Sequence, residues 1–371
     1  MTQKSVDKLI EELNRKYKPE GSVVPVVARS DERPRQNFIP PTSPALGFVL
    51  GSGGWSEGHL HEFFGKEHAG KTTLMMLALK DCYEHYDGKR PIAFIDIEHR
   101  YNDEWARQLG LPTDLIVVQP TDAEQATDIM HSLIKPKSAE ATGVCAIGFD
   151  SIGAAMSYKE HEFVGDREML MAGAAKIMTR NVRTIAPLAN LYQSTIFYSN
   201  QLRANMTGYG GPQTPGGYAV KHMMSCRIYL WPTSSNDTKK FDKIDGQEVQ
   251  VGFEMNFRAV KNTFGPPHRD GKSVFYFRPS KLFPSVGFDV EADIQTLGLL
   301  TGIIERSGSY YSYADVKEQG RDKFFAKVKE GQLYEGLLGE IQEQLNSKFS
   351  TTFGEDEDRG SEFIDIIDPE V

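Results

Sequence analysis

Apolar residues near the N-terminus follow the spacing of a helix. Val6, Leu9, Ile10, Leu13 and Tyr17 form one stripe, which predicts an amphipathic helix over residues 4–17. A polar, proline-bearing stretch follows it. Because a lone helix on a linker cannot bury its own stripe, we expect it to pack either on the body of the protein or on a neighbouring subunit.

Short apolar runs then alternate with helical patterns over residues 46–230. This alternation predicts βαβ units and a mainly parallel, twisted sheet covered on both faces. The fold class is therefore α/β. The expected strands are Leu60–Phe64, Ile92–Asp96, Leu115–Val118, Val144–Asp150 and Thr195–Ser199, and the expected helices are Thr72–Tyr86, Ala123–Leu133 and Leu170–Ala189.

The pattern changes after residue 248. Strict alternation over 249–259 predicts a long half-buried strand, and a Gly- and Pro-rich turn at Gly265–Gly271 leads into Val274–Phe277, which predicts a hairpin. Helical stretches at Glu291–Leu300 and Gln332–Lys348 indicate a small α+β domain. We divide the chain into a helix and linker (1–45), a core (46–278), a C-terminal α+β domain (279–350) and a tail (351–371).

Charge is unevenly distributed in the 371-residue chain, whose net charge is −9. Residues 355–371 hold eight acids and one arginine, so this segment carries −7 and the rest only −2. The tail is expected to be a disordered acidic appendage. A nearly neutral body can still carry a local basic stripe for nucleic acid.

The cysteines and the apolar runs indicate the compartment. Cys82, Cys145 and Cys226 are too few and too scattered for a disulfide framework or a zinc site, so we expect buried free thiols. No apolar run approaches the ~18 residues of a membrane span, and the N-terminus lacks a signal-peptide core. We expect a soluble, cytoplasmic protein with no membrane partner.

One motif carries the strongest chemical signal. Residues 65–72 match G-x-x-x-x-G-K-[ST] between an expected strand and an expected helix, a pattern that chance produces in on the order of one in a hundred such chains. Backbone N–H groups there would surround the phosphates of ATP, Lys71 would reach the β- and γ-phosphates, and Thr72 would bind Mg²⁺. The expected nucleotide-binding residues are Gly65, Lys66, Glu67, His68, Ala69, Gly70, Lys71, Thr72 and Thr73.

Polar residues follow three of the expected strands, where ligands of such sheets bind. Glu98 could activate a water against the γ-phosphate, Asp150 could hold Mg²⁺, and Gln201 could sense the γ-phosphate. Taken singly, they could equally be a helix N-terminal acid, a cap and a loop amide. Their placement at successive strand ends behind a complete phosphate-binding loop favours the functional interpretation.

At these residues the chain resembles the RecA family of homologous-recombination ATPases. The resemblance covers most of the chain, and its divergence from bacterial members favours a phage-encoded protein. The matching segments include Phe94-Ile95-Asp96-Ile97-Glu98-His99, Asp150-Ser151, Asn200-Gln201-Leu202-Arg203, Gly216-Gly217 with Lys221, and Val260-Lys261-Asn262.

The resemblance implies a helical homo-oligomeric filament on DNA, with ATP and Mg²⁺ between adjacent subunits. The N-terminal helix would dock on the neighbour. Trp105 would lie against adenine, and Lys261 would reach the next subunit's phosphates and join Glu98, Lys71 and Gln201 in catalysis.

Two loops, about Glu162–Met171 and Ala204–Pro215, would hold DNA. Basic side chains there would meet phosphates, apolar ones would separate bases, and glycine N–H groups would bind a phosphate. Met171, Lys176 and Arg183 could instead be ordinary helix residues. The expected DNA-binding residues are Arg167, Met171, Lys176, Arg183, Arg203, Met206, Gly216 and Gly217, with Met169 and Leu170 as further apolar candidates.

Two positions depart from the family pattern. The family's second cross-subunit lysine is Thr263 here, so Lys261 would act alone or with Arg258 or Arg269. An aromatic residue at the subunit interface is replaced by His222.

The function expected from the sequence is that of a DNA-dependent ATPase and strand-exchange recombinase. It would bind single-stranded and double-stranded DNA, with single-strand-binding and mediator proteins as further partners, and the acidic tail would weaken binding to duplex. The alternatives are a hexameric helicase motor, an ATP-switched DNA-binding or regulatory protein, and a small-molecule kinase. Family-specific segments argue against the first, Glu98 against the second, and the lack of a lid-like arginine cluster against the third.

Overall fold

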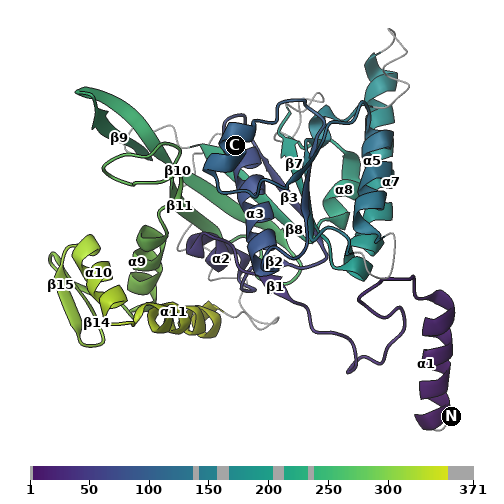
Figure 1. Cartoon of the computed structure of the whole chain (residues 1–371), viewed down its shortest axis with the longest axis horizontal. Helices are drawn as coiled ribbons and strands as arrows, with labels where there is room; N and C mark the ends of the chain where they lie inside the picture. The colour runs from purple at the N-terminus through teal and green to yellow at the C-terminus, as the bar shows by residue number, and fades with distance from the viewer. Residues whose placement is uncertain (1–2, 137–141, 157–166, 204–212, 233–237, 350–371) are drawn as a thin grey trace.

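A computed structural model describes residues 3–136, 142–156, 167–203, 213–232 and 238–349 of the chain. Its centre is a ten-stranded sheet with the order β12-β11-β10-β8-β3-β7-β6-β4-β5, in which β9 also pairs with β10 (Figure 1). The six strands from β8 to β5 are parallel. The sequence predicted a mainly parallel sheet and five of these strands, but not β8. They are β3 (Leu60–Gly65), β4 (Ile92–Asp96), β5 (Ile116–Val118), β6 (Ala146–Asp150), β7 (Thr195–Gln201) and β8 (Cys226–Pro232).

The remaining strands of the sheet are antiparallel. The long strand β10 (Gln247–Asn262) pairs with β8 on one side and with β11 (Asp270–Tyr276) on the other, which confirms the predicted hairpin. Strand β9 (Lys239–Ile244) pairs with the first part of β10, and β12 (Gly287–Phe288) closes the edge beside β11.

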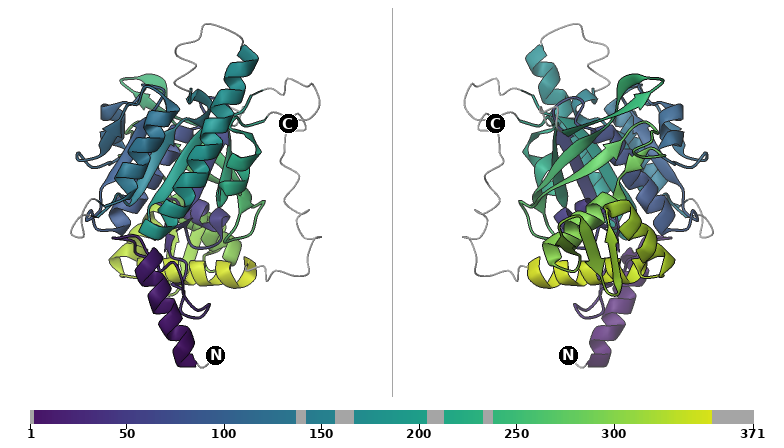
Figure 2. Two further views of the ribbon diagram at one scale, coloured as in Figure 1. Left: turned by 90° about the vertical axis from the view of Figure 1, so that its right-hand side faces the viewer. Right: turned by 90° about the vertical axis from the view of Figure 1, so that its left-hand side faces the viewer.

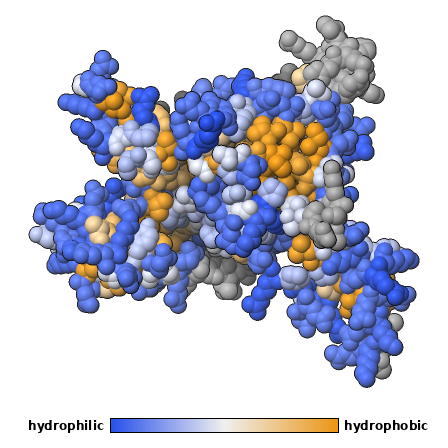
Figure 3. Space-filling model, viewed as in Figure 1, coloured by the Kyte–Doolittle hydropathy of each residue, from blue (hydrophilic) through white to orange (hydrophobic). Residues whose placement is uncertain are grey.

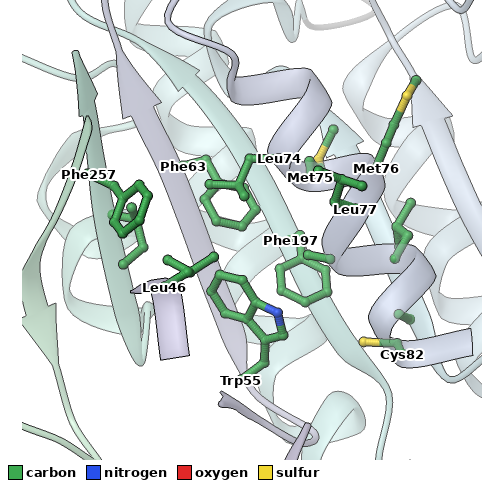
Figure 4. Close-up of a cluster of buried hydrophobic side chains, with 14 of the residues drawn as sticks. Leu46, Trp55, Phe63, Leu74, Met75, Met76, Leu77, Cys82, Phe197 and Phe257 are labelled. Atoms are coloured by element: carbon green, nitrogen blue, oxygen red, sulfur yellow. The ribbon is translucent and has the colours of Figure 1, made fainter. Parts of the chain in front are cut away.

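Helices cover both faces of the sheet, and neighbouring strand residues point to opposite layers. Phe94 belongs to the core cluster beneath α2 (Pro44–Leu50) and α3 (Lys71–His85), whereas Ile95 belongs to the cluster beneath α5 (Ala123–Ile134) and α7 (Arg167–Tyr192). Helices α5 and α7 lie side by side (Figure 2). In the first cluster the rings of Trp55, Phe63 and Phe197 pack together next to α3 (Figure 4).

Short elements complete the core. Strands β1 (Phe38–Ile39) and β2 (Trp55–Ser56) pair antiparallel, and α4 (Asp103–Gln108) follows β4. A single 3₁₀ turn, Ile152–Ala154, follows β6, and α8 (Gly217–Met223) packs against α7.

The predicted N-terminal helix is present as α1 (Gln3–Tyr17), and none of its residues is buried. Leu9 is 44% exposed and Tyr17 56% exposed, so the apolar stripe does not pack on the core of its own chain. The helix projects away from the body (Figure 1). The side chains of Asn14 and Asp7 form hydrogen bonds with Val27 and Arg29 of the following linker.

Residues 290–349 build a separate hydrophobic cluster. It is formed by α9 (Val290–Thr301), a three-stranded sheet of β13 (Glu305–Ser307), β14 (Tyr310–Tyr313) and β15 (Val316–Gln319), α10 (Arg321–Glu330) and α11 (Tyr334–Phe349). The sequence predicted α9 and α11 but not α10 or the small sheet. Asp293 of α9 accepts a 2.6 Å hydrogen bond from Ser43, the residue that caps α2, and so ties this part to the core.

Several boundaries predicted from the sequence differ in the structure, and three of them bear on the proposed site. Strand β7 continues through Gln201 because it pairs with β3 as far as Gly65. Asp270 and Gly271 open β11 rather than the turn, because β10 supplies their partners. Residues 167–171 belong to α7, not to a loop, while 162–166 lie outside the described residues.

The cysteines are buried and free, as predicted. Within the described ranges, no helix is long and apolar enough to cross a membrane.

Candidate functional site

The phosphate-binding loop connects β3 to α3 in the predicted strand–loop–helix order. Lys66, Glu67 and His68 are exposed, Ala69 is buried, and Lys71, Thr72 and Thr73 form the first turn of α3. Two glycines are required by the packing. A Cβ on Gly65 would lie 2.0 Å from the Leu230 carbonyl oxygen, and Gly70 has φ +87° with the Met255 methyl 2.6 Å from any added Cβ.

Lys71 turns back over the loop. Its ammonium donates to the carbonyl oxygens of Gly65 (3.2 Å) and Lys66 (2.6 Å). Burial lowers the pKa of Lys71, and the carboxylates of Asp150, Glu67 and Glu98 partly oppose this. The exposed loop and the free N–H groups of the first turn of α3 are suited to an anion.

A carboxylate faces the first turn of α3. Asp150, at the end of β6, accepts a 2.7 Å hydrogen bond from the Thr72 hydroxyl and another from Ser199 of β7. Burial raises the pKa of Asp150, and the hydrogen bonds from Ser199 and Thr72 partly oppose this increase. Sequence reasoning missed Ser199, which only the register of β6 against β7 brings to this position.

These oxygens fit Mg²⁺ rather than a metal held by protein alone. Among the described residues no group of three or more His, Cys, Asp and Glu side chains could hold a metal ion. A hydroxyl and one carboxylate beside an anion-binding loop match the way Mg²⁺ is bound through few protein ligands plus nucleotide phosphates.

Glu98 follows β4 and lies beside the end of β6. It accepts a 2.5 Å hydrogen bond from Ser151, and its second oxygen lies 3.3 Å from the exposed Arg100 guanidinium. The turn is held by Asp96, which is 2% exposed and accepts from the N–H groups of Arg100 (3.0 Å) and Tyr101 (2.8 Å). Asp96 pairs with Asp150 in the sheet, which explains why Glu98 reaches the site.

Gln201 is the last residue of β7 and pairs directly with Gly65, the first residue of the phosphate-binding loop. The N–H of Leu202 also donates to the Gly65 carbonyl oxygen at 3.3 Å. The end of β7 is thus attached to the loop through the backbone.

Trp105 lies in α4, whose N-cap Asn102 accepts from the Trp105 N–H at 2.9 Å. The indole is partly buried, and its centroid lies 6.3 Å from that of Phe275.

Lys261 lies away from the phosphate-binding loop of its own chain. In β10 it pairs with Arg227 at the start of β8, whereas Gly65 pairs with Leu230 further along β8. The Lys261 ammonium donates to the carbonyl oxygens of His222 (2.7 Å) and Lys221 (3.1 Å) at the end of α8. His222 is exposed and packs against Tyr218.

The two arginines considered as substitutes for the missing second lysine are engaged elsewhere. Arg258 makes two hydrogen bonds to Asp270, and Arg269 donates to the Phe48 carbonyl oxygen at 3.1 Å.

The expected DNA-binding residues that the structure describes lie on α7, just after β7 and at the start of α8. Lys176 and Arg183 are exposed on α7, and Arg203 is exposed with its guanidinium donating to the Gly153 carbonyl oxygen at 2.7 Å. Gly216 is the N-cap of α8 and Gly217 is its first residue, with φ +98° and +76°. Arg167 and Met171 lie in α7 with side chains outside the described set, and Met206 lies outside the described residues.

A parallel sheet, a glycine-rich loop at a helix N-terminus and a strand-end carboxylate define the class of P-loop nucleotide-binding proteins.

Comparison with known proteins then defines the family. The family described as "RecA N-terminal domain" matches residues 4–278. A "Protein RecA" of Wolinella succinogenes is 30% identical over 96% of each chain, and one of Bacteroides thetaiotaomicron is 34% identical over 84% of this chain and 88% of its own. A "Mitochondrial DNA repair protein recA homolog" of Dictyostelium discoideum is 32% identical over 84% of this chain and 64% of its own. The chain belongs to the RecA family of recombinases, which act in DNA recombination and repair.

Proposed function

We propose that this chain is a DNA-dependent ATPase and strand-exchange recombinase that assembles with ATP on single-stranded DNA. The observation that carries the proposal is the register of Gly65 against Gln201, which joins the phosphate-binding loop to the strand that leads into the segment expected to hold DNA. Membership of the RecA family supports DNA as the partner. Glu98 and Asp150 at the strand ends support ATP hydrolysis.

The proposed roles follow from the contacts. ATP supplies the phosphoryl group and Mg²⁺ the charge that would compensate its oxygens. Lys71 and the first turn of α3 bind phosphate, Thr72 and Asp150 hold the metal, and Glu98 orients and deprotonates the attacking water. The Glu98 side chain is only 16% exposed, and the hydrogen bond from Ser151 holds its carboxylate in place.

A second subunit would complete the site. The unburied apolar stripe of α1 needs a partner surface, and Figure 3 shows apolar side chains among the hydrophilic ones on this helix as well as a broader apolar patch on the core. Lys261 would contribute its charge to the phosphates bound by the neighbour. Trp105 would pack against the adenine ring, and Phe275 would support it from behind.

DNA would be held by the exposed basic side chains of Lys176, Arg183 and Arg203. The backbone N–H groups of Gly216 and Gly217 would also hold it. Arg203 and the two glycines lie on either side of the segment 204–212. Arg167, Met171 and Met206 remain candidates from the sequence.

The test is ATP hydrolysis by the full chain with and without single-stranded DNA. We expect several-fold stimulation by DNA, and filaments rather than closed rings in electron micrographs. A Lys71→Ala variant measures the background. Absence of stimulation would overturn the recombinase proposal while leaving nucleotide binding intact, and closed rings would favour a helicase motor.

A further inference from the structure

A buried carboxylate near the phosphate-binding loop has no part in the chemistry described above. Glu62 lies in β3, three residues before Gly65, and its side chain is 0% exposed. One oxygen accepts a 2.8 Å hydrogen bond from the Asn200 amide, and the other accepts from the Arg227 guanidinium. Glu62 therefore bridges β7 and β8 beneath the site.

Both partners of Glu62 also reach the segment that precedes α8. The Asn200 amide donates to the Pro215 carbonyl oxygen at 3.0 Å, and Arg227 donates to the Thr214 hydroxyl at 3.2 Å. We call this closed set of contacts the Glu62 ring. Its members are Glu62, Asn200, Thr214, Pro215 and Arg227.

The ring is stiff for physical reasons. Removing one partner of a buried ion pair leaves an uncompensated charge, and hydrogen bonds in a low-dielectric interior strengthen one another. The Arg227 guanidinium also lies 4.6 Å from the centroid of the Phe64 ring, which limits its movement.

One member of the ring is attached to the expected γ-phosphate sensor. Asn200 directly precedes Gln201, and its side-chain oxygen accepts the Gln201 N–H at 3.0 Å. A shift at Gln201 therefore moves the Asn200 amide, whose other contacts are Glu62 and Pro215. The backbone N–H and carbonyl groups of Arg203 and Gln213 form two hydrogen bonds of 2.9 Å. Gln213, which begins the stretch leading to α8, is therefore joined to the residues that follow β7.

We propose that Asn200 and Arg227, bridged by Glu62, are positioning residues that couple the end of β7 to residues 213–217 and thereby make ATP hydrolysis respond to DNA. The inference rests on the proposed function, since it assumes that Gln201 meets the nucleotide and that residues 213–217 adjoin bound DNA. None of the ring residues belongs to the phosphate-binding loop or to the residues proposed to hold the metal and activate water.

Arg227→Lys is the sharpest variant. Lysine keeps the charge opposite Glu62 but lacks the second donor that reaches Thr214. We expect hydrolysis without DNA to stay within about twofold of the unsubstituted protein, whereas the stimulation by single-stranded DNA falls at least fivefold. If the ring only supported the fold, Arg227→Lys would lower the stability and the hydrolysis rates with and without DNA together.

Arg90→Lys is the matched control. Arg90 is a half-buried arginine whose guanidinium donates to four carbonyl oxygens, those of Gly143, Val144, Tyr192 and Gln193, at the opposite end of the sheet. The same substitution there should reduce stability and leave the stimulation ratio unchanged. An equal loss of stimulation in both variants would overturn the proposal.

A second readout needs no DNA. Hydrogen–deuterium exchange across 213–224 should change when a non-hydrolysable ATP analogue binds the unsubstituted chain, and this change should be lost in Arg227→Lys and in Thr214→Val. A retained change in either folded variant contradicts the inference. If the unsubstituted protein binds the analogue but shows no DNA stimulation, the proposed function fails; if it is stimulated and Arg227→Lys is stimulated equally, only the ring proposal fails.

Discussion

The Thr72 hydroxyl donates a 2.7 Å hydrogen bond to the Asp150 carboxylate and so joins the first turn of α3 to the end of β6. The two groups come from positions 78 residues apart. Only Thr72 belongs to the phosphate-binding motif, and Asp150 reaches it because β6 lies two strands from β3 in the sheet.

Thr72→Val should reduce ATP hydrolysis by more than tenfold and raise the Mg²⁺ concentration needed for half-maximal rate. Valine has the shape of threonine but no oxygen ligand. Thr72→Ser keeps the hydroxyl and is the control. Hydrolysis measured across a Mg²⁺ titration distinguishes the two, and equal behaviour of Val and Ser variants would remove Thr72 from the metal site.

Glu98→Gln should lower hydrolysis by about 10²–10⁴-fold, the usual contribution of a general base, while ATP affinity stays within a few-fold. Single-turnover hydrolysis and equilibrium nucleotide binding measure the two effects. Arg100→Ala is the control, because Arg100 is 80% exposed by its side chain and such surface pairs contribute little. Normal turnover in the glutamine variant would show that another group activates water.

Lys261→Ala should abolish most DNA-stimulated hydrolysis without weakening ATP binding to an isolated subunit, because Lys261 lies away from its own phosphate-binding loop. Mixing Lys261→Ala subunits with Lys71→Ala subunits tests this. In the mixture, the intact Lys261 of a Lys71→Ala subunit could serve the intact phosphate-binding loop of a neighbouring Lys261→Ala subunit. We expect the mixture to exceed the sum of the separate rates. A rate equal to that sum contradicts a shared site.

Asp293→Asn should change how stability depends on pH. Burial raises the pKa of Asp293 to about 6, and hydrogen bonds from Ser43 and Ala45 oppose this. Because the folded pKa lies above that of the unfolded chain, the folded state binds the proton more tightly. The contribution of Asp293 to the free energy of unfolding therefore increases as pH falls from about 6 toward about 3.9, by up to about 1.4 kcal/mol per pH unit.

The asparagine variant lacks this proton but can still accept from both Ser43 and Ala45 through one oxygen. Urea unfolding at pH 7.5 and pH 5 should show the variant losing about 1–1.5 kcal/mol relative to the unsubstituted protein at the lower pH. An unchanged difference between the two proteins would show that Asp293 is not protonated on acidification.

Deleting residues 355–371 should raise affinity for duplex DNA, because the segment carries a charge of −7 that repels phosphates. Duplex binding at low and high salt measures this, and the gain should shrink as salt screens the repulsion. A variant with the eight acids replaced by their amides keeps the length and should behave like the deletion. Equal affinity of all three proteins would contradict a role for the charge.

The phosphate-binding loop, the parallel sheet and the strand-end residues Glu98 and Asp150 could be predicted from the sequence, because they depend on local patterns. A glycine-rich motif at a helix start and apolar strands ending in an acid are contiguous in the chain. Resemblance to the RecA family added Lys261 and Trp105, which no local pattern marks as functional.

Contacts between distant segments could not be predicted. Ser199 beside Asp150, the Glu62 ring and the hydrogen bond from Ser43 to Asp293 each join residues at least 49 positions apart or depend on strand register. Strand β7 extends to Gln201 because β3 offers backbone partners, not because of its own sequence.

The sequence by itself determined most helices and strands of the core and the residue types at their ends, since helix and strand periodicity and motif spacing are properties of neighbouring residues. The tertiary structure decided which strand ends meet and where buried charges find partners. A buried Glu62 is stable only where Asn200 and Arg227 converge on it, and that convergence exists only in the folded sheet.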